Sequence, residues 1–386
     1  MVTRNLVTAV YPTGYETREE PTLDLLTLER STRRLGLPSF DAVCAVALAC
    51  DDLLPQIPKT DEPTGTRSDW VAAVVAEPIL GTYIDDIGAV RFDRATFDRV
   101  FDQIAMELQS PATPYTAYAP IDNLTLPDGA VEVVAGIEMR PRDKEDLEQW
   151  INRGTPFERI NYIGVETVLE RPYLETVGEV RGARQSQDVI EQLMTAIQLH
   201  LNCDAYAAFV RFRCDATFHR SLGGTVTPAP HFGRQRGNLL RVHVGPIREL
   251  SERLGVSPNR TACELALGRW RSIAAGGSAS SVIVDAWIGL ESLLFRGGSS
   301  GEIIYRASLR LAALIGRDGA DAQSVLRQAR TAYNGRSKVL HGADTGKLDL
   351  PALAAVSRDF LRRALVAVLA KPTLFDPETI EHELLT

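Results

Sequence analysis

The sequence predicts an α+β protein with several domains, and the pattern of apolar residues changes twice along its 386 residues. Short segments in which apolar and polar residues alternate, as half-buried strands require, occur from about residue 120 to 255. After Pro258 they give way to long segments with helical spacing of apolar residues. We therefore expect an N-terminal mixed α/β region (1–118), a middle antiparallel β-rich domain (119–255) and a C-terminal all-α helical bundle (256–386).

The N-terminal region carries the weakest structural signals. The segment NLVTAVY is compatible with a short strand, and residues 40–54 and 92–108 have the apolar spacing of helices. The proline-rich segment SPATPYTAYAP, residues 110–120, is expected to be a connector. The sequence indicates no role for residues 1–118.

The middle domain is expected to contain strands at VEVVAGIEMRP, AYAAFVRFRC and LLRVHVGP. A helix over residues 186–201 interrupts them, because its apolar residues recur every four positions. The segment HFGRQRGN, residues 231–238, is expected to be a loop, either a plain connection or one whose Arg234 and Arg236 contact a ligand. An α+β domain with an antiparallel sheet follows, for which we expect a sensory or regulatory role.

The C-terminal third is expected to consist of helices near 261–275, 281–296, 302–316, 321–341 and 350–370. Each of the four breaks between them contains glycine suited to a helix C-terminus, and Ser or Asp placed to cap the next helix. The breaks are short, so consecutive helices should pack as a bundle. The last helix shows an apolar stripe on one face, formed by Phe360, Leu361, Ala364, Leu365, Val368 and Leu369.

Composition excludes several classes of protein. No apolar segment is long enough to cross a bilayer and no secretory pattern begins the chain, so we expect a cytoplasmic protein without membrane contact. The five cysteines form no CxxC pair, which argues against a disulfide framework and a zinc site. No metal or cofactor is expected. A metal hydrolase lacks a ligand cluster, since His382 and Glu383 have no second histidine at the required spacing.

Charge is unevenly distributed. The whole chain carries −8, yet residues 255–372 hold 16 Lys and Arg against 9 Asp and Glu, a balance of +7. Such a basic segment either binds a polyanion or only complements the acidic remainder of the chain.

Two acids interrupt an otherwise apolar helix, SVIVDAWIGLESLLF. A buried carboxylate needs hydrogen-bond donors or a cation, and the expected partners are Arg306, Arg310 and Arg336 on later helices. For Asp285 we favour a structural link. Glu291 either does the same or orients a catalytic arginine.

Arg336 and His341 lie five residues apart where the fourth helix of the bundle ends, in TAYNGRSKVLHGADTG. The negative end of the helix dipole favours a protonated imidazole, so His341 is suited to give and take protons. The Arg336 guanidinium is a permanent cation whose planar fork matches phosphate oxygens. On an ideal helix the two side chains start about 140° apart. Alone, this spacing is more typical of an ordinary helix end than of a catalytic site.

The blocks around this pair resemble the HEPN superfamily, specifically its Apea-like branch, over about residues 258–370. The specific features are the helix with Asp285 and Glu291 in DAWIGLESLL, the Tyr-Arg helix that follows, and the closing RSKVLHG. The resemblance implies a helical domain that dimerises through the helices carrying the motif. Many such proteins are metal-independent endoribonucleases that serve as toxins or effectors of antiviral defence.

By this resemblance, Arg336 and His341 match the family's Arg-x4-His pair, and Glu291 matches the acid of the second helix. The implied reaction is cleavage of RNA by its own 2′-hydroxyl, leaving a 2′,3′-cyclic phosphate and a 5′-hydroxyl. Ser337 stands where many catalytic members have Asn, Asp or His. The residues expected to contact the substrate are Lys338, Tyr333, Ser337 and Arg306. The expected partners are RNA, a second copy of the chain, and an antitoxin or a trigger-sensing protein. The alternative is a non-catalytic HEPN module that binds RNA or dimerises as a scaffold.

Overall fold

The computed structural model describes residues 112–144, 165–176, 181–214, 224–226, 235–256, 260–295, 303–342 and 348–371, with the single positions 95, 99, 102, 103, 106, 110, 146 and 346. Five of these single positions, 95, 99, 102, 103 and 106, are helical, and they fall in the helix expected over 92–108. The strand at NLVTAVY, the helix at 40–54 and Arg234 lie outside the described residues.

The chain divides into two compact units. The first comprises residues 1–118, 170–187 and 211–225, and the second comprises 119–169, 188–210 and 226–386. Every residue predicted to form the functional site belongs to the second unit.

The strands form an antiparallel sheet in the order β3-β4-β5-β1-β7-β8, with β6 also paired to β1. Along β1, Tyr115 pairs with Cys214 and Tyr118 with Arg211. The expected hairpin in VEVVAGIEMRP is present as β3 and β4, and AYAAFVRFRC supplies β6 and β7. The bounds are β1 (Ala112–Asp122), β3 (Val131–Val134), β4 (Ile137–Pro141), β5 (Thr167–Thr176), β6 (Tyr206–Ala207), β7 (Phe209–Cys214) and β8 (Gly224–Val226); a separate parallel pair is formed by β2 (Leu124–Thr125) and β9 (Gly237–Asn238).

The segment SPATPYTAYAP, residues 110–120, is expected from the sequence to be a connector. Most of it instead forms β1, the strand between β5 and β7 in the sheet. Its prolines are compatible with this position. Pro114 precedes the first residue paired with β7, and Pro120 takes part through its carbonyl oxygen, which accepts a hydrogen bond of 2.9 Å from the Ala208 N–H. Tyr115 and Ile121 are almost fully buried. The burial of these large side chains outweighs the loss of donors that proline causes.

The strand expected at LLRVHVGP is also wrong, because Arg241–Gly255 forms the helix α10. Val242 and Val244 imitate strand alternation, but Val242 is 72% exposed. The side chains that anchor this segment are Ile247 and Leu250, three residues apart and both buried. A helix brings that pair to one face, whereas a strand would place them on opposite faces.

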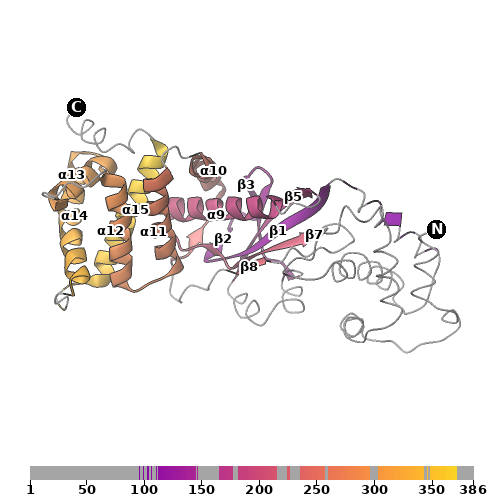
Figure 1. The fold of residues 1–386 in the computed structure, drawn as a ribbon, viewed down its shortest axis with the longest axis horizontal. Coiled ribbons are helices and arrows are strands. Elements are labelled where there is room, and N and C mark those ends of the chain that lie inside the picture. Colours follow the sequence, from indigo (N-terminus) through magenta and orange to yellow (C-terminus); the bar gives the residue numbers. More distant parts are fainter. Residues whose placement is uncertain are drawn as a thin grey trace, which may run out of the picture. The chain divides into compact units, whose positions relative to one another are not determined.

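The remaining helices are present where the sequence predicts them, although α9 begins five residues before the helix expected there. The five helices of the C-terminal third begin and end within two residues of the expected positions. In Figure 1 these helices lie alongside one another, coloured from brown-orange to yellow. Their bounds are α11 (Arg260–Ala275), α12 (Ala279–Leu294), α13 (Ile303–Ile315), α14 (Gly319–Leu340) and α15 (Leu350–Ala370); the helix expected over 186–201 is α9 (Arg181–Leu201).

The core of the bundle is centred on α12, which contacts α11, α13, α14 and α15. Trp287 on α12 and Trp270 on α11 are fully buried. All six residues of the predicted apolar stripe on α15 are buried as well. The bundle is therefore held chiefly by apolar burial around α12 and α15.

A second set of contacts joins the bundle to the C-terminal end of α9. Arg358 on α15 forms an ion pair of 2.6 Å with Asp204, and its guanidinium lies over the Trp270 ring at 5.2 Å. The Trp270 indole N–H donates to the Gln198 side chain on α9 at 3.1 Å. Asp204 and Trp270 are buried. These polar contacts determine how α9 docks on α11 and α15.

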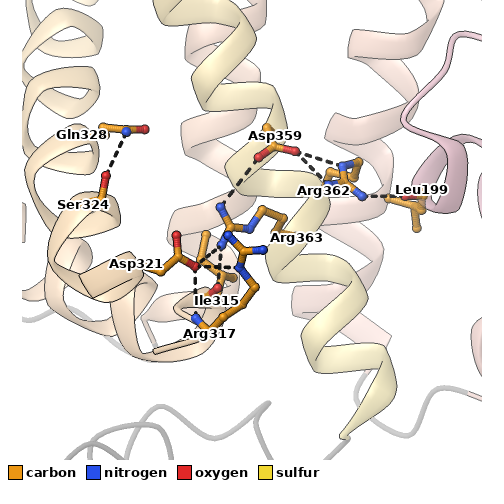
Figure 2. Close-up of polar contacts among 9 residues, drawn as sticks. All are labelled: Leu199, Ile315, Arg317, Asp321, Ser324, Gln328, Asp359, Arg362 and Arg363. Carbon is orange, nitrogen blue, oxygen red and sulfur yellow. Dashed lines mark hydrogen bonds and ion pairs between the residues drawn. The ribbon is translucent and has the colours of Figure 1, made fainter. Parts of the chain in front are cut away.

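Two arginines continue this arrangement along α15 (Figure 2). Arg362 donates to the Leu199 carbonyl at the end of α9 at 3.1 Å, and to Asp359. Arg363 donates to the Ile315 carbonyl at 2.6 Å and forms an ion pair of 3.2 Å with Asp321. α15 is thus joined to α9 by a hydrogen bond, to the last residue of α13 by another, and to the first turn of α14 by an ion pair.

We expect Arg358→Met to destabilise the protein by about 3 kcal/mol, because it leaves the Asp204 carboxylate buried without its cation. The measurement is the free energy of unfolding in urea. Arg317→Ala is the matched control, since Arg317 is highly exposed, and its midpoint should equal that of wild type. Equal midpoints for Arg358→Met and Arg317→Ala would contradict the assigned role of Arg358.

Stability should also decrease as the pH falls below about 6.5. Burial, with the nearby charges of His243 and Arg362, lowers the pKa of His200 at the end of α9 in the folded protein. The His200 and His243 rings are 5.3 Å apart. The unfolded chain, with an ordinary histidine pKa near 6.5, binds more protons in this range, so acid favours unfolding. Melting temperatures from pH 8 to 5 should fall less for His200→Gln than for wild type, and parallel profiles would refute this.

Candidate functional site

The candidate site is built on α14, which begins with a side-chain cap and ends at the predicted histidine. Asp318 caps the helix by accepting from the Asp321 N–H at 2.8 Å. The backbone N–H of His341 donates to the Ser337 carbonyl at 3.1 Å and closes the last turn. Arg336 therefore lies within regular helix, and His341 is its C-terminal cap residue.

Glu291 on α12 brings two side chains of α14 together. The Tyr333 hydroxyl donates to Glu291 Oε1 at 2.8 Å, and Arg336 Nη2 lies 3.2 Å from Glu291 Oε2. The Arg336 guanidinium also lies 5.4 Å from the centre of the Tyr333 ring. Each carboxylate oxygen thus has one donor, and the cation is held from two sides.

The surroundings of this cluster are largely apolar. The Trp287 ring packs edge-on against Tyr333, with ring centres 4.9 Å apart. Arg336 and Glu291 keep only 16% and 27% of their side chains exposed. Burial, followed by the hydrogen bond to Glu291, raises the pKa of Tyr333 to about 12. Tyr333 therefore stays a hydrogen-bond donor throughout the physiological range.

The residue beside Arg336 allows a neighbouring helix to approach. A Cβ atom at Gly335 would lie 2.9 Å from Cδ1 of Leu353 on α15. Real carbon atoms do not pack that closely, so a larger residue at this position would force the Leu353 side chain to move, and glycine lets α15 approach α14 closely. This glycine is explained by helix packing and requires no ligand.

The structure separates Arg336 and His341 to different faces of α14. Arg336 points to α12 through its contact with Glu291, whereas His341 is exposed. The 100° step of a helix places the two side chains about 140° apart. Within the described residues, no hydrogen bond or ion pair joins the His341 ring to Arg336.

The residues expected to contact a substrate occupy different environments. Lys338 is exposed, Ser337 and Arg306 are half-buried, and Tyr333 is 7% exposed with its hydroxyl on Glu291. Tyr333 thus orients Glu291, a role that residue spacing alone did not indicate. Sequence reasoning also missed Arg269 on α11, which forms an ion pair of 2.9 Å with Asp285. This contact is a structural link between α11 and α12.

No protein-family model, curated protein or solved structure matches the chain. The described helices include none long and apolar enough to cross a membrane. Over the same part of the chain, no group of three or more His, Cys, Asp or Glu is arranged to hold a metal ion.

We expect Tyr333→Phe to destabilise the protein by about 1–2 kcal/mol, because Glu291 loses a donor while the ring and its contact with Trp287 are retained. Chemical denaturation measures this difference. Tyr305→Phe on α13 is the matched control, since Tyr305 is 47% exposed and should give wild-type stability. If both variants unfold at the same denaturant concentration, the hydrogen bond to Glu291 contributes nothing.

Proposed function

We propose that the C-terminal helices form a metal-independent endoribonuclease of HEPN type. The observation that carries this proposal is the fixed Arg336 guanidinium, held by Glu291 and Tyr333 five residues before His341. A cation whose position is fixed in advance stabilises charge on a phosphate without the cost of ordering its side chain during the reaction. The sequence resemblance described above supports the same assignment.

The proposed reaction uses one proton donor and one proton acceptor. His341 removes the proton of a ribose 2′-hydroxyl, whose oxygen forms a bond to the adjacent phosphorus. The bond from phosphorus to the 5′-oxygen breaks, and that oxygen takes up a proton. Arg336 offsets the negative charge of the five-coordinate phosphate through the part of its guanidinium that Glu291 leaves open. The products are a 2′,3′-cyclic phosphate and a 5′-hydroxyl.

The reaction calls for a homodimer. One imidazole cannot readily act on opposite sides of a phosphorus atom, so we place His341 of a second copy at the leaving oxygen. Exposed apolar side chains on α13 and α14 support an interface between copies through these helices. They are Ile303, Tyr305 and Leu340, which are 40%, 47% and 50% exposed.

In a cell this activity would need restraint. We propose an effector of antiviral defence or a toxin acting in the cytoplasm. A trigger-sensing role for residues 119–255, or an antitoxin partner, would then control it. The contacts of Gln198 on α9 with α11, and of Asp204 after α9 with α15, offer a route by which the preceding region would act on the bundle.

The alternative is a non-catalytic scaffold that binds RNA or dimerises with the same helices. The separation of Arg336 and His341 to different faces of α14 favours it. In that case Arg336, Glu291 and Tyr333 form a structural ion-pair cluster, and His341 is an ordinary helix end.

The two functions are distinguished by incubating purified protein with end-labelled RNA in the presence of EDTA. The nuclease should produce cyclic-phosphate ends, and Arg336→Ala and His341→Ala should each lower the cleavage rate at least about 100-fold, the usual contribution of a general acid or base. Arg317→Ala should cleave like wild type.

An inert wild-type protein that still binds RNA would support the scaffold. Equal cleavage by wild type and His341→Ala would show that the nuclease activity comes from another site or a contaminant.

A further inference from the structure

The outer face of α14 carries a row of basic and amide side chains that leads to His341. Arg327, Arg330, Asn334 and Lys338 are all exposed, and together we call them the α14 strip. With 100° per residue, these four and His341 fall within an arc of about 80°, and Arg336 lies on the far side. Eleven residues separate Arg327 from Lys338, a rise of about 16 Å along the helix.

The charge of the α14 strip is not neutralised by its own helix. Residues 322–341 include four basic residues and no Asp or Glu. Other arginines in the bundle are ion-paired: Arg317 and Arg363 with Asp321, and Arg358 with Asp204. In the described part of the chain, the side chains of Arg327, Arg330 and Lys338 form no ion pair. Carboxylates therefore neutralise several arginines of the bundle, but not the three cations of this face.

We propose that the α14 strip binds the phosphate backbone of single-stranded RNA and leads it to His341. The inference rests on the RNA substrate proposed above, and it adds Arg327, Arg330 and Asn334 to the residues that bind it. Arginine binds phosphate with two parallel hydrogen bonds, and lysine adds a compact charge. Asn334 supplies neutral hydrogen bonds to phosphate or ribose between the two cationic ends.

The composition of the strip favours RNA over an acidic protein. Protein interfaces bury an apolar or aromatic centre from which charged residues are depleted. The strip contains no apolar residue, and the exposed Leu340 lies about 160° around the helix from Lys338. Nucleic-acid interfaces are polar and strongly basic, as this face is.

The test measures affinity for a fluorescein-labelled single-stranded oligoribonucleotide by anisotropy at several salt concentrations. The full chain carries His341→Ala in every sample, so that the probe stays intact. Adding Arg327→Ala and Arg330→Ala should weaken binding at least tenfold at low salt. The slope of log affinity against log salt should fall by about 1.4, since each lost phosphate contact on a single strand contributes about 0.7. Alanine favours an exposed helix, so α14 should remain folded.

Arg317→Ala in the same background is the matched control, because Arg317 is also exposed but is paired with Asp321. It should leave both affinity and slope unchanged. An unchanged slope when Arg327 and Arg330 are both replaced would overturn the proposal. So would a variant that keeps wild-type affinity for RNA but no longer binds polyglutamate, because that result would indicate an acidic protein partner.

The outcome for the strip is separable from that for the nuclease. RNA that binds through Arg327 and Arg330 but is never cut by the chain with His341 intact would support the strip and reject the nuclease. Cleavage and binding that survive Arg327→Ala and Arg330→Ala at wild-type levels would support the nuclease and reject the strip.

Discussion

The cost of holding the Glu291 carboxylate in an apolar helix is the constraint on which the candidate site depends. α12 lies at the centre of the bundle, where a charge without partners would be strongly unfavourable. Tyr333 and Arg336 satisfy one carboxylate oxygen each, and both come from α14. The carboxylate therefore determines the rotation of α14 about its axis, and that rotation decides which residues face solvent.

Arginine side chains also fix the position of α15. Arg358, Arg362 and Arg363 each reach a carboxylate or a backbone carbonyl on another element. Apolar packing alone would hold α15 in the bundle but would allow it to rotate or slide. Directional contacts at three points along one helix restrict those motions, so the end of α9 and the turn before α14 keep a fixed relation to the same helix.

The extent to which the sequence predicts this structure differs between elements. The bundle helices were predictable to within two residues, because long apolar repeats coincide with caps such as Asp318 and Asp349. β1 was not, since its prolines dominate a short window and its burial depends on strands distant in sequence. The pairing of Glu291 with Arg336 was among the options, but the hydroxyl of Tyr333 and the Arg269–Asp285 pair are tertiary contacts without a signal in residue spacing.

The two faces of α14 have a consequence for how the protein can diverge. Substitutions at Arg336, Tyr333 or Gly335 disturb the packing against α12 and α15, so change on that side is tightly limited. Exposed positions on the other side tolerate most residue types at little cost in stability. Lineages could therefore alter the ligand that this helix recognises, or lose it altogether, while the bundle itself stays unchanged.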